Sequence, residues 1–149
     1  MEKIEVGYWS IRGLGAPLRM MLMFGGPRPH TELQLVTYDI EYNADMEVNA
    51  DCWFVPKVEL KTQNPFINLP YAIDNDLLIS QTNAIFAHLG RKLNLWGTDS
   101  LEVSLCEQLL CEIYDLRNKM VAFAYRQSQG AEGNSAEALA LLENCAGAY

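Results

Sequence analysis

The sequence of 149 residues lacks the patterns that identify membrane and secreted proteins. No stretch approaches the roughly 18 consecutive apolar residues that a membrane-spanning helix needs. The N-terminal residues Met1-Glu2-Lys3-Ile4 lack the basic and apolar regions of a secretory signal, so a cytoplasmic location is expected. Because 50% of the residues are hydrophobic, the chain can bury a core and disorder is not expected.

Metal-binding and disulfide patterns are also missing from the sequence. It has two histidines and four cysteines, with no CxxC pair and no spacing typical of metal ligands. Neither histidine has a Cys or Ser partner that indicates a catalytic triad, so no metal and no histidine catalysis are predicted. Buried free thiols are expected in place of disulfides. The cysteines are Cys52, Cys106, Cys111 and Cys145.

Basic residues are few: 11 of them stand against 19 acidic residues, which gives a net charge of −8. Nucleic acids and anionic membranes bind proteins through basic stripes, so neither is expected as a partner. An acidic protein can still bind an anionic small molecule where positive groups gather locally. Lys57 and the N-terminus of a helix near Gln81 could form such a place.

The N-terminal segment predicts a strand, a turn and a helix. Residues 4–8 alternate apolar and polar side chains, Pro17 suits a first helical position, and an apolar run follows over 18–24. Open α/β sheets bind ligands at the carboxyl ends of their strands, which makes Tyr8 a candidate active-site phenol. The alternative is a Tyr8-Trp9 pair packed at a strand end, and these residues alone favour that alternative.

Strands and helices alternate over residues 1–92 and predict an α/β domain. Thr31–Tyr38 alternates as a second strand, and residues 39–63 form a polar, irregular stretch of the kind found in binding loops. A hairpin follows over 71–74 and 77–79, turning at Asn75-Asp76. Ser80 can cap the next helix, over 81–92.

Only helices are expected beyond the linker at 93–98, so residues 99–149 are assigned to a second, all-helical domain. Asp99 or Ser100 caps a long helix, in which apolar residues recur every three or four positions from Leu105 to Phe123. This spacing predicts that one face of the helix is core. Ser135 caps a final helical run over 136–149.

Three motifs in order resemble the cytosolic glutathione S-transferases, closest to their mu class. They are Gly7-Tyr8-Trp9-Ser10-Ile11-Arg12-Gly13-Leu14, then Trp53 with Lys57, and finally Asn68-Leu69-Pro70-Tyr71 through Ile85. The resemblance covers most of residues 4–126. It implies an α/β thioredoxin-like N-terminal domain followed by an all-α C-terminal domain, which in that family continues further. The present chain is therefore expected to be C-terminally truncated.

The resemblance implies a glutathione transferase that conjugates the glutathione thiolate to small hydrophobic electrophiles, with Tyr8 as the hydrogen-bond donor to the sulfur. Glutathione would be a co-substrate, no further cofactor is implied, and the protein would form a homodimer. A glutathione-dependent isomerase or peroxidase would use the same thiolate. The alternative of another kind is a non-catalytic glutathione-binding or structural relative, whose truncated helical domain has lost activity.

The resemblance also assigns roles to individual residues. Pro70 would follow a cis peptide bond, Asp115 would reach the glutathione of the neighbouring subunit, and Tyr125 would face the second substrate. Asp115-Leu116-Arg117 is more similar to the pi or sigma classes, so the class stays open. The glutathione-binding residues would be Tyr8, Trp9, Leu14, Trp53, Lys57, Asn68, Leu69, Gln81, Thr82 and Asp115.

Each assignment has a structural alternative. Trp53 could anchor a loop, and Lys57 could be a solvated charge. Gln81 and Thr82 could be ordinary residues of a first helical turn, and Asp115 could pair with Lys119 one turn along its helix. The ordered set of motifs, and no single residue, favours the functional assignments.

Overall fold

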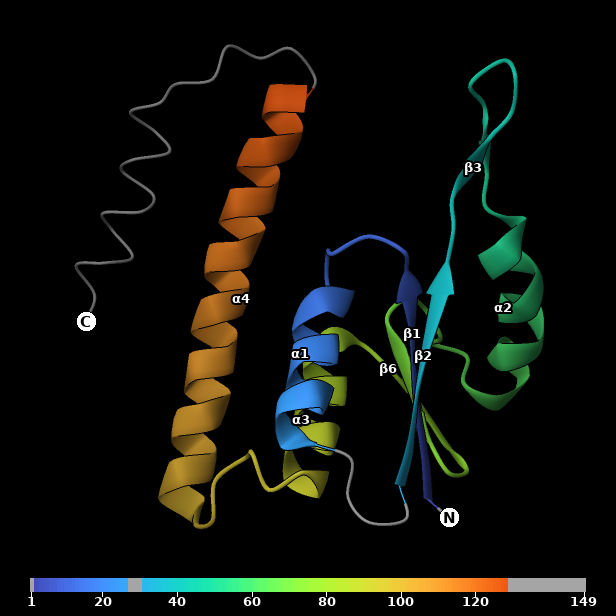
Figure 1. Ribbon diagram of the computed structural model, residues 1–149. Coiled ribbons are helices and arrows are strands. Elements are labelled where there is room, and N and C mark those ends of the chain that lie inside the picture. Colours follow the sequence, from blue (N-terminus) through green and yellow to red (C-terminus); the bar gives the residue numbers. More distant parts are fainter. Residues whose placement is uncertain (1, 27–30, 129–149) are drawn as a thin grey trace. The chain divides into compact units, whose positions relative to one another are not determined.

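The computed structural model describes residues 2–26 and 31–128, and the chain divides into two compact units, 1–98 and 99–149. Figure 1 shows the order of the elements along the chain. The N-terminal unit contains β1 (Glu2–Trp9), α1 (Gly15–Gly25), β2 (Thr31–Tyr38), β3 (Glu41–Tyr42), β4 (Val48–Asn49), α2 (Asp51–Gln63), β5 (Tyr71–Asp74), β6 (Leu77–Ser80) and α3 (Thr82–Lys92). In the C-terminal unit the described element is α4 (Ser100–Ser128).

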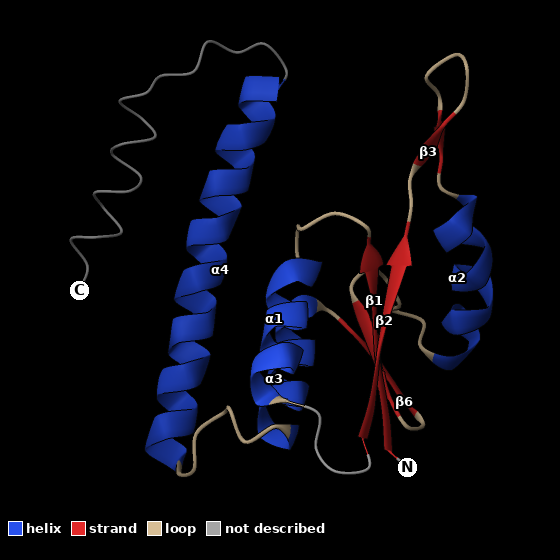
Figure 2. Ribbon diagram, viewed as in Figure 1, coloured by secondary structure: helices blue, strands red, loops and turns tan. Residues whose placement is uncertain are grey.

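The N-terminal unit is a mixed four-stranded sheet in the order β2-β1-β5-β6, with helices on both faces. β1 runs parallel to β2 and antiparallel to β5, and β5 and β6 form an antiparallel hairpin. Helices α1 and α3 cover one face of the sheet, and α2 covers the other (Figures 1 and 2). This arrangement, followed by a helical unit, confirms the predicted fold class.

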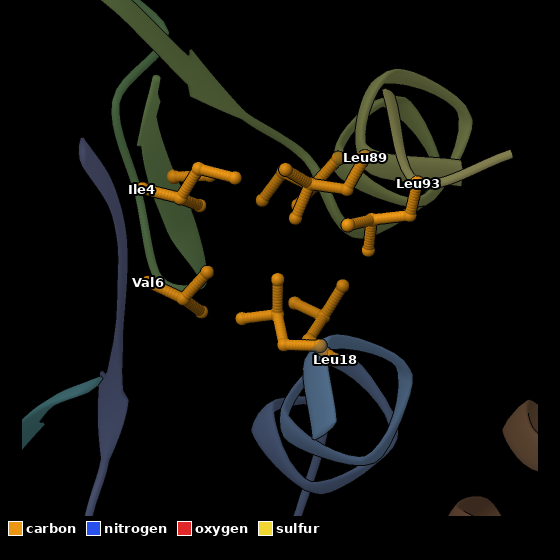
Figure 3. Close-up of a cluster of buried hydrophobic side chains, with 8 residues drawn as sticks. Ile4, Val6, Leu18, Leu89 and Leu93 are labelled. Atoms are coloured by element: carbon orange, nitrogen blue, oxygen red, sulfur yellow. The ribbon is translucent and has the colours of Figure 1, made fainter. Parts of the chain in front are cut away.

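The main core lies between the sheet and helices α1 and α3. Ile4 and Val6 of β1 point toward Leu18 of α1 and toward Leu89 and Leu93 at the end of α3 (Figure 3). Because successive side chains of a strand point to opposite faces, Glu5 and Gly7 lie on the α2 face. Each fully buried leucine or isoleucine contributes about 1.5–3 kcal/mol through the hydrophobic effect.

The strand predictions agree with the structure: β2 spans Thr31–Tyr38, and β5 and β6 form the expected hairpin. The prediction for residues 39–63 was wrong over its second half, which is helix α2. Pro56 lies inside this helix, and Phe54, Val55 and Val58 are exposed. The segment therefore shows neither the composition nor the apolar spacing by which a surface helix is predicted.

The predicted capping role of Ser80 was also wrong. Ser80 ends β6, and its hydroxyl accepts a hydrogen bond from the N–H of Asn68 and donates one to the carbonyl of Asn68, both at 3.0 Å. The N-cap of α3 is Gln81. At the next helix the capping prediction was right: Oδ1 of Asp99 accepts hydrogen bonds from the N–H groups of Leu101 and Glu102.

The apolar face predicted for α4 is not buried within the described residues. Leu105, Leu109, Ile113 and Met120 are between 48% and 55% exposed. A single helix cannot bury its own face, and the described part of the C-terminal unit is α4 alone. The predicted final helix at 136–149 and its cap Ser135 lie outside the described residues.

The cysteines differ from the expectation of buried thiols. Cys52 and Cys111 are exposed free thiols, Cys106 is a half-buried one, and Cys145 lies outside the described residues. Cys52 lies in α2, a helix that the sequence did not predict, and Cys111 lies in α4 outside the apolar positions that predicted its core face. Over residues 2–26 and 31–128, no helix has the length and apolar character required to cross a bilayer.

Candidate functional site

One edge of the sheet gathers most of the residues singled out in the sequence. Gly7 of β1 is paired with Tyr71 of β5, and Tyr71 is paired with Ser80 of β6, so the three residues form a row across three strands. The next residue outward on β1 is Tyr8, and the residue that follows β6 is Gln81. Since neighbouring strands lie about 4.8 Å apart, Tyr8 and Gln81 emerge at the same edge within roughly 10 Å.

Tyr8 is held at this edge by two glycines of the following turn and helix. Its side chain is 8% exposed, and its hydroxyl oxygen would stand 2.6 Å from a β-carbon added at Gly13. A β-carbon at Gly15 would stand 2.5 Å from the Tyr8 ring. The two glycines therefore create the space in which the phenol lies, a role that the sequence analysis missed although their spacing beside Tyr8 was visible.

The two other predicted residues of this segment lie on either side of the turn. Trp9 is the last residue of β1, is half-buried, and meets the ring of Tyr38 edge-on with 6.4 Å between ring centroids. Leu14 is the half-buried N-cap residue of α1. Arg19 donates a hydrogen bond of 2.9 Å to the carbonyl of Ile11 and so ties the turn to α1.

The loop that enters β5 contains the expected cis peptide bond, between Leu69 and Pro70. The Ser80 hydroxyl, through its two hydrogen bonds to the backbone of Asn68, fixes this loop beside the end of β6. Leu69 is half-buried and follows the exposed Asn68. Ser80 is thus a second site-building residue that the sequence analysis missed, because serine before a helix is more typical of a cap.

Gln81 has φ = 74°, a left-handed conformation that costs a residue with a β-carbon roughly 1–3 kcal/mol. Its side chain is exposed, and in the described part of the chain no side-chain hydrogen bond caps α3. The first N–H groups of α3 therefore face the same edge as Tyr8 and can accept an anion. Thr82, the first residue of this helix, is 6% exposed.

Trp53 lies in the core between α2 and the sheet. It is 1% exposed, and its ring stacks on Tyr71 with centroids 5.9 Å apart and planes at 14°. It also contacts Tyr38 edge-on at 5.2 Å. The ring is therefore a packing anchor, and the role of its indole N–H toward a ligand stays a prediction.

Lys57 lies one turn further along α2, beside the loop of Asn68. Its Nζ atom donates a hydrogen bond of 3.3 Å to Oδ1 of Asn68 and lies 5.6 Å from the centroid of the Trp53 ring. A lysine ammonium has three donors, so it can bind an additional acceptor from this position. Lys57 and Asn68 thus form a polar pair on the α2 side of the sheet edge.

The opposite end of the sheet carries a buried ionic cluster. The carboxylate of Asp74 is 2.8 Å from Nζ of Lys92 and 2.8 Å from Nε2 of His88. Burial raises the pKa of Asp74, but the hydrogen bonds from Lys92 and His88 outweigh burial and hold that pKa below its usual value. The hydrogen bond with Asp74 raises the pKa of Lys92. The cluster ties the β5–β6 hairpin to α3 and lies far from the row of Tyr71.

The two candidate residues of the C-terminal unit lie on α4. Asp115 and Tyr125 are exposed, Tyr125 to 66%. Ten residues of helix separate them by about 15 Å along its axis. The alternative of an ion pair with Lys119 is not observed for Asp115 within the described part of α4. Among described residues no three His, Cys, Asp or Glu side chains converge as a metal site.

The fold defines the class of protein: a thioredoxin-like domain followed by a helical unit. No family model matches the sequence. The sequence is 34% identical over 127 residues to a glutathione S-transferase of Tyrophagus putrescentiae, an alignment that covers 83% of this chain and 52% of the relative. It is 33% identical over 122 residues to glutathione S-transferase Mu 6 of Mus musculus, with 82% and 52% covered.

A solved structure gives the same result. The glutathione S-transferase Blo t 8 superposes with a TM-score of 0.64 at 29% identity, over 81% of this chain and 50% of that one. The chain belongs to the glutathione S-transferase family. It spans about half the length of the curated relatives it matches.

Proposed function

We propose that this chain carries the glutathione site of a mu-like glutathione transferase, which joins the thiolate of the tripeptide to small hydrophobic electrophiles. The row of Gly7, Tyr71 and Ser80 is the observation that carries the proposal. It brings a buried phenol, a cis-proline loop and an uncapped helix N-terminus to one edge of the sheet. Membership of the family supports the same conclusion.

Tyr8 would act on the sulfur. A free thiol has a pKa of about 8.5 and is mostly protonated at neutral pH, so an enzyme must favour the thiolate. A hydroxyl that donates a hydrogen bond to the sulfur stabilises the charged form and lowers the thiol pKa. The thiol proton leaves to solvent and the sulfur forms a bond to the electrophilic carbon. The electron pair displaced from that carbon departs with the leaving group in a substitution, or takes up a proton on the neighbouring atom in an addition.

The cysteinyl and γ-glutamyl parts of the tripeptide would lie along the sheet edge. The backbone of Leu69 would pair with the cysteinyl backbone like an added strand, and Leu14 would border the sulfur. The γ-glutamyl carboxylate would lie at the N-terminus of α3, where the backbone N–H groups of Gln81 and Thr82 and the helix dipole favour an anion. The exposed side chain of Gln81 supports this position.

The glycyl carboxylate would lie near Lys57 and Asn68, with Trp9 bordering this arm. The Lys57 ammonium would supply the positive charge that pairs with this carboxylate. Its hydrogen bond to Asn68 limits the positions that the ammonium can take. Trp53 would support Lys57 from within the core, since its ring is buried.

We also propose that the protein is a cytoplasmic homodimer. Asp115 would then reach the glutathione of the neighbouring subunit, and Tyr125 would face the electrophile. The resemblance motivates both assignments, and the exposure of the two side chains on α4 is consistent with them.

A thiol titration tests the catalytic part of the proposal. The absorbance of the thiolate in the ultraviolet is followed against pH for glutathione bound to the wild-type chain and to Tyr8→Phe. We expect the variant to bind glutathione and to raise the pKa of the bound thiol by about one unit or more, which corresponds to ~1.4 kcal/mol. Tyr42→Phe, at an exposed tyrosine of β3, is the control. An unchanged titration in Tyr8→Phe would remove Tyr8 from the chemistry.

A further inference from the structure

A chain of hydroxyl groups lies on the α2 face of the sheet, behind the candidate site. Tyr71 donates a hydrogen bond of 2.9 Å to Oε1 of Glu5. The hydroxyl oxygens of Tyr38 and Tyr71 are also 2.9 Å apart. Because a phenol has one proton and that of Tyr71 is used toward Glu5, Tyr38 must be the donor in its bond to Tyr71. The hydrogen bonds therefore run in one direction: Tyr38 donates to Tyr71, and Tyr71 donates to Glu5.

Both phenols stay protonated at neutral pH. Burial is the largest cause that raises the pKa of Tyr71 above its usual range, and its hydrogen bonds with Tyr38 and Glu5 add to the effect. Burial likewise raises the pKa of Tyr38, against a lowering by the hydrogen bond with Tyr71. The two hydroxyls therefore keep their protons and act as donors at neutral pH.

Strand β1 is shaped to admit this network. A β-carbon at Gly7 would stand 2.1 Å from the Tyr71 ring, so only glycine leaves room for that ring against the sheet. A phenylalanine would fill the same space at lower cost, because a buried hydroxyl must be desolvated and then satisfied. The network therefore provides orientation beyond what packing alone requires.

What the two rings orient is Trp53. Tyr71 stacks on the indole ring at 5.9 Å, and Tyr38 meets it edge-on at 5.2 Å. On the same ring lies Nζ of Lys57, 5.6 Å from the centroid, and Lys57 in turn donates to Asn68. An unbroken series of contacts thus joins the half-buried carboxylate of Glu5 to Lys57 and Asn68 at the sheet edge.

We propose that Tyr38 and Tyr71 are positioning residues for the glycyl arm of glutathione, acting through the Trp53 ring on Lys57. This inference rests on the proposed function and assigns part of the affinity for the terminal glycine to hydroxyl groups that never touch the ligand. It separates the glycyl subsite, which depends on the network, from the sulfur site at Tyr8, which does not.

The test compares glutathione with γ-glutamylcysteine, which lacks the glycine. Calorimetric affinities for both ligands are measured on the full chain and on Tyr71→Phe and Tyr38→Phe, with Tyr42→Phe as the matched control. The wild-type chain should prefer glutathione, and either network variant should reduce that preference about three- to tenfold, the range expected for one lost hydrogen bond. Tyr38→Phe keeps the bond from Tyr71 to Glu5, so it remains informative if Tyr71→Phe does not fold.

The Lys57→Ala background adds a second criterion. If the network acts through Lys57, adding Tyr38→Phe to Lys57→Ala should cause no further loss of preference for glutathione. Folded network variants that keep the full wild-type preference, or that weaken both ligands equally, would overturn the inference. Wild-type binding of both ligands with equal affinity would overturn it while leaving the sulfur site intact. A wild-type chain that binds neither ligand would overturn the proposed function and this inference with it.

Discussion

The hydroxyl of Tyr8 lies against Gly13, so close that a β-carbon at position 13 would stand 2.6 Å from the phenol oxygen. Gly13 also has φ = 34°, a conformation that L-residues with a β-carbon rarely adopt. The turn between β1 and α1 thus holds the Tyr8 side chain in place by contact with its hydroxyl group. Any change at position 13 should affect both the backbone and the chemistry.

Gly13→Ala should move the Tyr8 hydroxyl and lower the conjugation rate at least about tenfold, in addition to a loss of roughly 1–2 kcal/mol in the free energy of unfolding. Gly26→Ala is the matched control, because Gly26 also has a positive φ, of 70°, but a β-carbon there would meet no atom of the described residues within 4 Å. Gly26→Ala should lower the free energy of unfolding and leave the conjugation rate unchanged. If folded Gly13→Ala and folded Gly26→Ala conjugate glutathione at the same rate, the contact between Gly13 and Tyr8 does not affect the chemistry.

The strands could be predicted from the sequence because their evidence is local. Alternation fixed Thr31–Tyr38, and Asn75-Asp76 between two apolar runs fixed the hairpin. Helix α2 could not be predicted in this way, since its contribution to the core comes from Trp53 and its stability depends on tertiary packing.

Trp53→Phe distinguishes a packing role from a ligand role. The substitution keeps an aromatic ring on Tyr71 and removes the indole N–H. We expect the free energy of unfolding to fall by about 1–3 kcal/mol, from the cavity left by the smaller ring, and glutathione affinity to fall by about three- to tenfold, because the smaller ring orients Lys57 less well. A loss of affinity well beyond tenfold with little loss of stability would show that the indole N–H binds the tripeptide.

Lys57→Ala should weaken glutathione binding about ten- to 150-fold, the equivalent of a lost charged hydrogen bond, and should change kcat much less than KM. Lys61→Ala is the control, since Lys61 lies one turn further along the same helix and is exposed. Steady-state kinetics with varied glutathione measures both constants. A fall in kcat with unchanged affinity would show that Lys57 does not hold the glycyl carboxylate.

Asp74→Asn should lower the free energy of unfolding by about 2 kcal/mol at neutral pH, because a buried charged hydrogen bond to Lys92 is weakened. The folded pKa of Asp74 is below its ordinary value of about 3.9, so its carboxylate stabilises the fold above that pH. This contribution should disappear as the pH falls through the folded pKa.

Urea denaturation from neutral to acidic pH measures the effect. The difference between the wild-type chain and Asp74→Asn should be constant near neutral pH and should shrink at the acid end. Asp76→Asn, in the same hairpin and exposed, should stay within about 0.5 kcal/mol of wild type throughout. A difference between wild type and Asp74→Asn that does not depend on pH would rule out the ionised carboxylate as its source.

The candidate site was partly predictable from the sequence. The positions of Tyr8, Leu69 and Gln81 followed from motifs at the ends of strands and at the start of a helix. Their convergence depends on strand register, which places Gly7, Tyr71 and Ser80 in one row and which no local pattern encodes. The Ser80–Asn68 bonds and the left-handed Gln81 follow from that register, and both appear only in three dimensions.

Isothermal titration of glutathione into the 149-residue chain tests the central claim most directly, with the folded state checked by circular dichroism and the oligomeric state recorded. The account predicts saturable binding of one glutathione per chain, weakened in Lys57→Ala and retained in Lys61→Ala. A folded chain that shows no saturable binding would contradict the account, and the assignments of Tyr8, Leu69, Gln81 and Lys57 would fall together.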